Sequence, residues 1–395
     1  MTYFDWAATA KPDLEVLDAV AGIASRYYGN PSSIHAAGRE SEQLLVESRN
    51  MLAEALGCQA QEVIFTSGGT ESNNMVAFSV LQKLASGVMT RVKPRVVVSG
   101  IEHASVFAPV TTLQRLGFDT VVINTRDSGF IDPRDIRDAF NERTAMVLVM
   151  LVNNETGAIQ PVAEIAACAA EYSASHGRRI HVHTDAVQAL GKIPFCLPDL
   201  GVDTASLSGH KIGAPRGVGA LYVRRGAPIE FLYTGGGQES ERRPGTENLA
   251  SIYGFALAAR KAIGALQQQS ERTGVLSQKL LDELTQFEGA TVVPSSRICR
   301  QSDFSPYILN IAFPPIPGEV VVRVLEDEGF LVSTGSACSS RLKKRTRVLE
   351  NMGLAPEIAR SAVRFSFGSQ TTIEDIVGLA DAIKSKIPPM VRVFG

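Results

Sequence analysis

The sequence predicts an α/β fold with a mostly parallel sheet, followed by a smaller α+β part. Three observations support this prediction. Long amphipathic helices alternate with short β-rich runs between residues 35 and 225. Several of these runs are hydrophobic throughout, as strands covered on both faces must be. The pattern changes after Asn248, and we expect the chain to leave the large sheet near residues 250–260.

The expected elements follow one another in a regular order. Residues 35–56 form an amphipathic helix that ends before Gly57. Apolar runs predict strands at 96–98, 121–123, 145–152, 180–184, 205–208 and 219–223. One or two helices are expected within 250–288, and short strands mixed with helices within 308–393. Ligands of open α/β sheets bind beyond the carboxyl ends of the strands, so the polar segments that follow the strands are the candidate site.

Length and composition narrow the class of protein. A chain of 395 residues is long for one hydrophobic core and favours two domains, or one large body with an appendage. Hydrophobic residues make up 45% and charged residues 20%, which excludes a disordered, collagen-like or coiled-coil chain. The 39 Lys and Arg nearly balance the 41 Asp and Glu, so the net charge of −2 gives no reason to expect a nucleic-acid partner.

The sequence also bears on location. The longest apolar run covers residues 145–152, well short of the ~18–20 residues that span a bilayer. No secretory signal or transit peptide is visible. The five cysteines are odd in number, widely spaced and without a Cys-x-x-Cys pair, which argues against a disulfide framework or a zinc ribbon. We therefore expect a cytoplasmic enzyme with no membrane partner.

The first candidate site is a small, glycine-containing turn at residues 65–73, which enters a helix that begins near Glu71. Backbone N–H groups and the helix dipole make such a turn suitable for a phosphate, with Ser and Thr hydroxyls as further donors. It is neither a Walker P-loop nor a dinucleotide-binding turn. The alternative is a plain capped turn.

The second candidate is the run of residues 180–188. His181 and His183 share one face of a strand, as a metal pair would, but no third ligand is apparent, and we prefer two packed or hydrogen-bonded histidines with no metal site. Asp185 ends the strand. A carboxylate there caps a helix, or holds a protonated ring nitrogen by a charge-assisted hydrogen bond.

The third candidate is Lys211, which follows Ser208, Gly209 and His210 at the end of a predicted strand. A lysine among small residues is poorly explained as a surface charge, and a lysine whose pKa is lowered forms Schiff bases with aldehydes. The alternative is an exposed surface lysine.

The fourth candidate is Cys338, within a run of small polar residues at 332–340. Structural cysteines prefer apolar surroundings, so this setting favours a reactive thiol. Arg364 lies between β-like apolar residues and is either an edge charge or a clamp for a carboxylate. A phosphate-binding turn, a carboxylate for a ring nitrogen and a Schiff-base lysine together describe a pyridoxal phosphate site. An arginine and a thiol extend it to amino-acid chemistry at sulfur.

The sequence resembles the cysteine desulfurases of the class V aminotransferase superfamily, above all the group whose catalytic segment reads Ser-x-Gly-Ser-Ala-Cys. The resemblance covers almost the whole chain. It rests on residues 28–33 with His35, 65–73, 102–103, 152–157, 185–188, 208–211, 235–239 and 242–248, the Cys338 segment and 364–366.

The resemblance implies a fold-type I pyridoxal phosphate enzyme and a homodimer. Its large domain, residues 12–254, would contain a seven-stranded sheet. Its small domain would combine residues 1–11 with 255–395 and carry the cysteine loop at about 333–345. The reaction implied is the conversion of L-cysteine to L-alanine, with a persulfide on Cys338 that passes to a sulfur-acceptor protein in iron–sulfur cluster or thio-cofactor biosynthesis.

The resemblance also implies a role for each site residue. Lys211 would form the Schiff base and remove the Cα proton, Asp185 would pair with the pyridine nitrogen, and Gln188 would bond the ring hydroxyl. His103 would stack on the ring and carry a proton for a thiol. The phosphate would be held by Gly69, Thr70, Ser208 and His210, with Thr246 from the partner subunit. Asn154 and Arg364 would take the substrate carboxylate.

Three features of the chain depart from the family pattern or leave choices open. Ala10 and Ser339 stand where the family often has Thr. Five basic residues fall within 341–347, and they form either a solvated helix face or a docking site for an acidic acceptor. The alternatives for function are a selenocysteine lyase, another class V enzyme, or a catalytically silent scaffold homologue.

Overall fold

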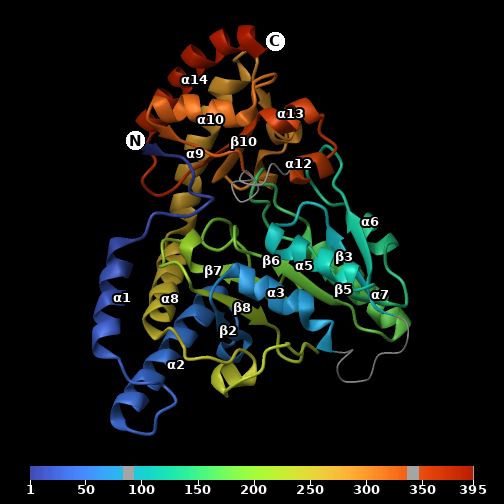
Figure 1. Ribbon diagram of the computed structural model, residues 1–395, viewed down its shortest axis with the longest axis vertical. Coiled ribbons are helices and arrows are strands. Elements are labelled where there is room, and N and C mark those ends of the chain that lie inside the picture. Colours follow the sequence, from blue (N-terminus) through green and yellow to red (C-terminus); the bar gives the residue numbers. More distant parts are fainter. Residues whose placement is uncertain (83–92, 336–346, 395) are drawn as a thin grey trace.

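The computed structural model describes residues 1–82, 93–335 and 347–394 (Figure 1). Two bodies are built around separate sheets. The larger contains a sheet of seven strands, and the smaller contains a sheet of three.

The seven strands lie in the order β2-β8-β7-β6-β5-β3-β4. Strand β8 runs antiparallel to both its neighbours, and the strands from β7 through β4 are mutually parallel, which confirms the mostly parallel sheet. The bounds are β2 Val63–Thr66, β3 Arg95–Ser99, β4 Asp119–Ile123, β5 Thr144–Leu148, β6 His181–Asp185, β7 Thr204–Ser208 and β8 Gly219–Val223.

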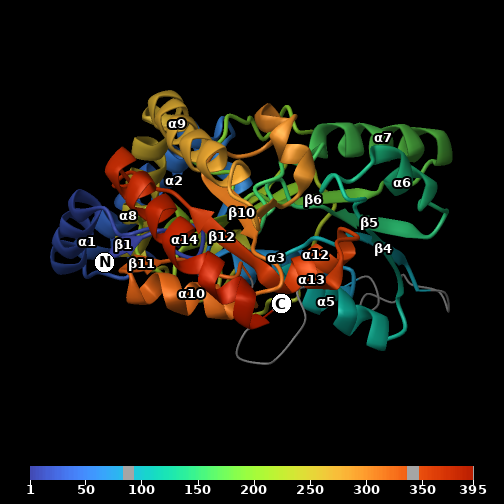
Figure 2. The same ribbon diagram turned by 90° about the horizontal axis from the view of Figure 1, so that it is seen from above.

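Helices cover both faces of this sheet (Figure 2). Their bounds are α1 Leu14–Arg26, α2 Ala36–Leu56, α3 Gly69–Ser79, α5 Ala104–Arg115, α6 Pro133–Asp138, α7 Val162–His176 and α8 Leu249–Gly264. Successive strand residues point to opposite faces: Val97 packs with α2, α6, α7 and α8, whereas Val96 and Val98 pack with α3 and α5. Strands buried on both sides explain the continuous apolar runs in the sequence.

The expected helix at 35–56 is confirmed as α2. His35 caps it by accepting a hydrogen bond from the Gly38 N–H at its ring, and the helix ends at Gly57 in the left-handed conformation with φ 67°. Glycine adopts this conformation without the penalty that a Cβ brings. The predicted strands also form, within a few residues of their expected ends.

The second body is an antiparallel sheet covered by helices. Its strands are β9 Thr291–Val292, β10 Ile308–Ala312 and β12 Ala362–Ser366, with β10 in the centre. Its helices are α9 Leu266–Thr285, α10 Gly318–Asp327, α12 Arg347–Asn351, α13 Pro356–Ser361 and α14 Ile373–Phe394. The N-terminal strand β1, Thr2–Tyr3, pairs in parallel with β11, Phe330–Leu331, and Phe4 is buried in the same core.

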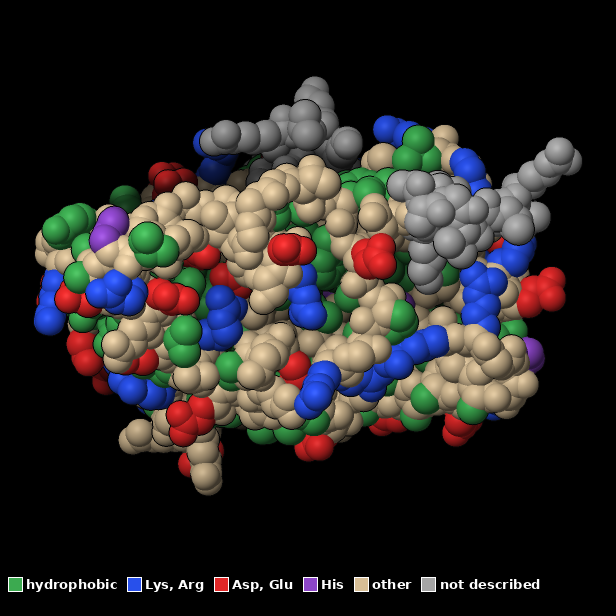
Figure 3. Space-filling model, turned by 90° about the horizontal axis from the view of Figure 1, so that it is seen from below, with side chains coloured by type: hydrophobic (Ala, Val, Ile, Leu, Met, Phe, Trp, Pro, Cys, Tyr) green, Lys and Arg blue, Asp and Glu red, His purple; other side chains and the backbone are tan. Residues whose placement is uncertain are grey.

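The division into residues 12–254 and 1–11 with 255–395 stays a proposal. Helix α8 packs into the core of the large body as far as Ile263, beyond the expected boundary at residue 254, and α9 contributes Leu276 to the core of the small one. On the face shown in Figure 3, basic and acidic side chains are interspersed. No single helix among the described residues is long and apolar enough to cross a membrane; the pair α8 and α9, bent by 69°, would pass by length and composition only.

Candidate active site

A cavity of about 350 Å3 lies where the polypeptide follows the carboxyl ends of the parallel strands. Segments from β2, β3, β5, β6 and β7 reach it from the large body, and Arg364 on β12 reaches it from the small one. The cavity brings together most of the predicted site residues: Gly69, Thr70, His103, Asn154, Asp185, Gln188, Ser208, His210, Lys211 and Arg364.

Two predicted residues are not part of this cavity as described. Thr246 is exposed and does not line the cavity of its own chain. Cys338, with the rest of its segment at 336–346, lies outside the described residues.

Lys211 ends a short 3-10 helix, Gly209–Lys211, that follows β7 directly. Its Nζ donates hydrogen bonds to the carbonyl oxygens of Ala7 at 2.6 Å and Ala8 at 2.8 Å. A lysine held by buried carbonyl groups in a cavity is not a solvated surface charge. The neighbouring ring of His210 approaches the Thr9 hydroxyl at 3.2 Å, and burial, aided by the charge of Lys211, lowers the pKa of His210 to about 4.

Asp185 ends β6 with a side chain that is 5% exposed. One carboxylate oxygen accepts from the Asn73 side-chain amide at 2.7 Å and the other from the Val187 N–H at 3.0 Å. The carboxylate is therefore fixed in orientation and lines the cavity. Such a group can receive a hydrogen bond from a protonated ring nitrogen.

His181 and His183 are two buried, hydrogen-bonded histidines, as favoured from the sequence. Each places a ring nitrogen 2.9 Å from the Thr204 hydroxyl, and the other nitrogen of His183 lies 3.0 Å from the carbonyl oxygen of the Asn73 side chain. Burial lowers the pKa of His183 to about 3, so its ring is neutral.

His103 caps α5 and lines the cavity. Its Nδ1 lies 2.7 Å from the Ser105 hydroxyl and accepts the Ser105 N–H at 3.2 Å. Burial holds the pKa of His103 below its usual range, while the charge of Asp185 opposes this shift.

The turn before α3 has the shape expected of a phosphate-binding turn. Gly68 has φ 149°, and no side chain caps the helix at this residue. A Cβ on Gly69 would lie 2.6 Å from Val187 Cγ2, so only glycine lets this backbone approach so closely. The N-terminus of α3 therefore leaves room beside Thr70 and Ser208 for an anion.

Arg364 is 2% exposed, which excludes an edge charge. One Nη donates to Asp5 at 2.7 Å and the other to the Asn154 carbonyl oxygen at 2.8 Å. No described residue pairs with the buried Arg364 Nε or with the buried side-chain oxygen of Asn154. The guanidinium is therefore fixed in position, and its Nε–H is a donor with no partner among the described residues.

Arg347, the last residue of the basic run, is not a freely solvated charge. Its guanidinium donates to the carbonyl oxygens of Gly100 and Glu102 and lies 3.9 Å from the Phe107 ring centre. It also lines the cavity. For this residue the interpretation as a solvated helix face was wrong, and the docking site stays a prediction; the other basic residues lie outside the described part of the chain.

Two buried acids in the cavity were not singled out from the sequence as site residues. Burial raises the pKa of Glu102 to about 8 and that of Glu155 to about 7. One oxygen of Glu102 accepts from the Ser99 hydroxyl at 2.5 Å and the Met150 N–H at 2.6 Å. The second oxygen of each acid has no partner among the described residues.

Lys192 is a further buried group that sequence reasoning missed. It is 7% exposed and donates to Gln188 Oε1 at 2.8 Å, while Gln188 Nε2 donates to the Ala7 carbonyl at 2.9 Å. Burial lowers the pKa of Lys192 to about 7. The only sequence feature that could have indicated this contact is the spacing: Lys192 lies four residues after Gln188.

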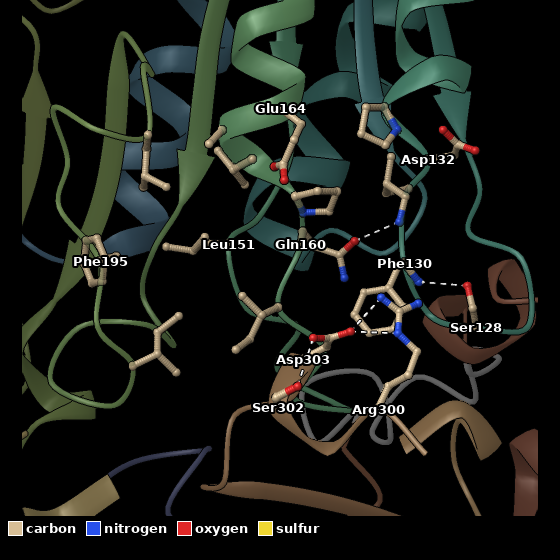
Figure 4. A pocket seen from close by; sticks show the side chains of 18 of the residues that line it. Ser128, Phe130, Asp132, Leu151, Gln160, Glu164, Phe195, Arg300, Ser302 and Asp303 are labelled. Carbon is tan, nitrogen blue, oxygen red and sulfur yellow. Dashed lines mark hydrogen bonds and ion pairs between the residues drawn. The ribbon is translucent and has the colours of Figure 1, made fainter. Parts of the chain in front are cut away.

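A larger cavity of about 930 Å3 lies elsewhere, between α6, α7 and residues 300–303 (Figure 4). Some of its polar groups are bonded within the chain: Gln160 accepts from the Ile131 N–H at 2.9 Å, and Arg300 pairs with Asp303 at 2.6 Å. None of the predicted site residues within the described ranges lines it. The smaller cavity is therefore the candidate active site.

Residues 2–379 match the family model of the class-V aminotransferases. The chain belongs to this family. It is 38% identical over 382 residues to "Cysteine desulfurase IscS" of Dictyoglomus turgidum, an alignment that covers 97% of this chain and 93% of the relative. The family recognised from the motifs is confirmed.

Solved structures agree with this assignment. A "NifS-like protein" superposes with a TM-score of 0.87 at 33% identity, covering 97% of this chain and 98% of the other. A structure described as "SspA in complex with cysteine" superposes with a TM-score of 0.79 at 28% identity, covering 93% and 99%. The predicted fold class is confirmed, and class-V aminotransferases are pyridoxal phosphate enzymes.

The residues of this class-V aminotransferase fit such a cofactor. The uncapped N-terminus of α3, with Gly69 pressed against Val187, suits a phosphate. The fixed carboxylate of Asp185 suits a protonated ring nitrogen. Lys211 supplies an amine in the same cavity.

Proposed function

We propose that this chain is a pyridoxal phosphate-dependent cysteine desulfurase that converts L-cysteine to L-alanine and transfers the sulfur through a persulfide on Cys338. The observation that supports this most is the single cavity that gathers Lys211, Asp185, His103 and Arg364 from four separate segments. The relatives named as cysteine desulfurases and the structure with bound cysteine agree with it.

The cofactor would be held at both ends. Asp185 would hold the ring nitrogen and Gln188 the ring hydroxyl, while Thr70, Ser208 and His210 would hold the phosphate, together with Thr246 of the partner subunit. When bound, pyridoxal phosphate supplies an electron sink for the α-carbon of an amino acid. His103 would lie against the cofactor ring.

Lys211 is the residue for proton transfer at the α-carbon. Its Nζ is positioned by the carbonyl oxygens of Ala7 and Ala8, which accept hydrogen bonds but cannot supply a proton. The N-terminal segment therefore orients the amine without competing for its role as an acid or base.

Arg364 and Asn154 would bind the substrate carboxylate. Asp5 and the Asn154 carbonyl already fix the guanidinium plane, so little side-chain freedom is lost when a carboxylate arrives. The buried Arg364 Nε, which has no partner among the described residues, is a donor for that carboxylate.

Cys338 would accept the sulfur. Its thiolate forms an S–S bond with the sulfur of cysteine as the C–S bond breaks; the bonding electron pair stays with the carbon fragment, which takes up a proton and leaves as alanine. The persulfide then passes to a sulfur-acceptor protein of iron–sulfur cluster or thio-cofactor biosynthesis. We place the enzyme in the cytoplasm as a homodimer.

The test is the release of sulfide and alanine from L-cysteine in the presence of a reductant. We expect equal amounts from the wild type, and no turnover from Lys211→Ala or Cys338→Ser. Full activity of Cys338→Ser would overturn the persulfide step and favour a lyase that eliminates sulfur directly. Turnover of L-selenocysteine alone would replace the proposed substrate.

A further inference from the structure

One buried side-chain amide joins three groups beside the cavity. Asn73, on α3, is 1% exposed. Its Nδ2 donates to Asp185 at 2.7 Å and to the Ser105 hydroxyl at 2.8 Å, and its Oδ1 lies 3.0 Å from His183 Nε2. Both the nitrogen and the oxygen of this amide therefore have hydrogen-bond partners.

The charge of Asp185 sets the direction of these hydrogen bonds. An ionised carboxylate only accepts, so the amide must turn its nitrogen toward Asp185 and its oxygen toward His183. The neutral His183 ring then donates from Nε2, and its Nδ1 accepts from the Thr204 hydroxyl at 2.9 Å. The orientation of the Asn73 amide is therefore fixed by Asp185 on its nitrogen and by His183 on its oxygen.

The same amide determines what Ser105 can do. Because the Ser105 oxygen accepts from Asn73, its O–H is free to donate to His103 Nδ1 at 2.7 Å. The Ser105 backbone N–H donates to the same nitrogen at 3.2 Å. An imidazole nitrogen that accepts from two donors cannot also carry a proton.

We propose that Asn73 and Ser105 are positioning residues that keep His103 as the neutral tautomer with its proton on Nε2. This inference deepens the proposed function, on which it rests for the identity of the bound substrate. His103 thus presents an N–H donor, and no basic nitrogen, to the amino acid in the cavity. The Nε2–H can donate to the sulfur of the substrate cysteine, and the removal of the α-proton is left to Lys211.

Charged groups from several elements face the His103 ring. Asp185 favours a protonated ring, whereas Lys211, Arg347 and Arg364 disfavour it. Three cations against one carboxylate agree with the neutral ring that the hydrogen bonds require. The readout must therefore separate the effect of the Ser105 bond from that of the surrounding charges.

The test is nitrogen NMR of holoenzyme labelled with 15N-histidine, with the His103 signals identified by their loss in His103→Gln. We expect a protonated Nε2 and an unprotonated Nδ1 in the wild type. In Ser105→Ala we expect a mixture of tautomers and a His103 pKa higher by roughly one unit, because the donor that disfavours the imidazolium is gone. Ser105→Thr keeps the hydroxyl and should restore the wild-type signals.

A matched control lies on the same helix. Thr112→Ala also removes a hydroxyl from α5, one that bonds only the Ala108 carbonyl, and should leave the His103 signals unchanged. A proton on Nδ1 in the wild type, or unchanged signals in Ser105→Ala, would overturn the proposal. If the tautomer is as expected but L-cysteine is not turned over, it is the proposed function that fails.

Discussion

The cavity holds two acids whose pKa values burial raises, and for Glu102 the effect on stability has a defined sign. Burial raises the pKa of Glu102 from 4.5 to about 8. Between these values the folded chain retains a proton that the unfolded chain releases, so the free energy of unfolding falls as pH rises through this window. The loss is complete above the folded-state pKa.

Glu102→Gln should remove this dependence. The amide oxygen can accept from Ser99 and Met150 as the carboxyl group does, and no charge develops at high pH. We expect the variant to gain stability relative to wild type above about pH 8, with a slope that differs by up to about 1.4 kcal/mol per pH unit between about pH 5 and 8. Urea unfolding across this range measures it, with a substitution at an exposed acid, Glu40→Gln, as the control. Parallel profiles for Glu102→Gln and wild type would contradict a protonated Glu102.

The buried Lys192 leads to a second prediction, for the pH range between about 7 and 10.5. Its pKa falls from 10.5 to about 7, so between these values the unfolded chain binds a proton that the folded chain does not, and stability rises with pH. Lys192→Met should abolish this rise. It should also weaken cofactor binding roughly tenfold, because Gln188 loses the donor that orients its amide.

The measurement for Lys192→Met is cofactor dissociation followed by absorbance, together with urea unfolding between about pH 7 and 10. Lys386→Met removes a lysine from a partly exposed ion pair with Glu328 and serves as the control. Cofactor affinity equal to that of the control would show that Gln188 does not depend on Lys192.

At the scale of elements, the junction between β2 and α3 depends on the absence of one side chain. Gly69→Ala would place a Cβ 2.6 Å from Val187 Cγ2, which forces the Val187 side chain, the helix N-terminus or the segment after β6 to move. We expect a loss of about 1–3 kcal/mol in stability and weaker binding of phosphate and cofactor.

Gly22→Ala is the matched control for that substitution. Gly22 lies in α1, and no other group lies within 4 Å of the position that its Cβ would take, so alanine should stabilise the helix by roughly 0.5–1 kcal/mol. Inorganic phosphate affinity by calorimetry distinguishes the two variants. Unchanged phosphate binding in Gly69→Ala would remove the N-terminus of α3 from the phosphate site.

Elements were the most predictable part of this molecule. Apolar residues predicted α2 and six of the seven strands of the large sheet, because α2 is buried on one face and most of these strands on both. Strand β2 was not predicted. Arg347 was misinterpreted because a charge in a basic run is typical of a surface residue, and only the fold places Phe107 and two carbonyl groups around it. The sequence around Arg347 does not indicate these contacts, because the residues that make them are remote in the chain.

At the scale of the whole molecule, the site combines segments that are remote in sequence. The pairing of Asp5 with Arg364 joins residues 359 apart, and no periodicity in either segment points to the other. The roles proposed for Lys211 and Asp185 could be inferred from the sequence because each follows a predicted strand. The sequence did not indicate the contacts of Asn73, Ser105 and Lys192, because the partners of these side chains are known only from the fold.

Mixed dimers test the role of Thr246 across the subunit interface. Lys211→Ala and Thr246→Glu should each be inactive alone, the second because its carboxylate repels the phosphate. If Thr246 of the partner subunit completes the site, mixing the two by unfolding and refolding should restore about a quarter of wild-type activity, since half the dimers are hybrids with one intact site. No recovery, with hybrids verified by mass spectrometry, would place Thr246 in the site of its own chain or outside it.

The pairing of β1 with β11 has a consequence for how the chain is made. Thr2 lies against Phe330, so the first strand to leave the ribosome waits for a partner that emerges about 330 residues later. At roughly 5–20 residues per second this delay lasts from about a quarter of a minute to a minute. Ala7 and Ala8, whose carbonyl groups accept hydrogen bonds from Lys211 Nζ, lie a few residues after that strand. The nascent chain can therefore complete its large sheet early, yet becomes competent for catalysis only when synthesis is nearly finished.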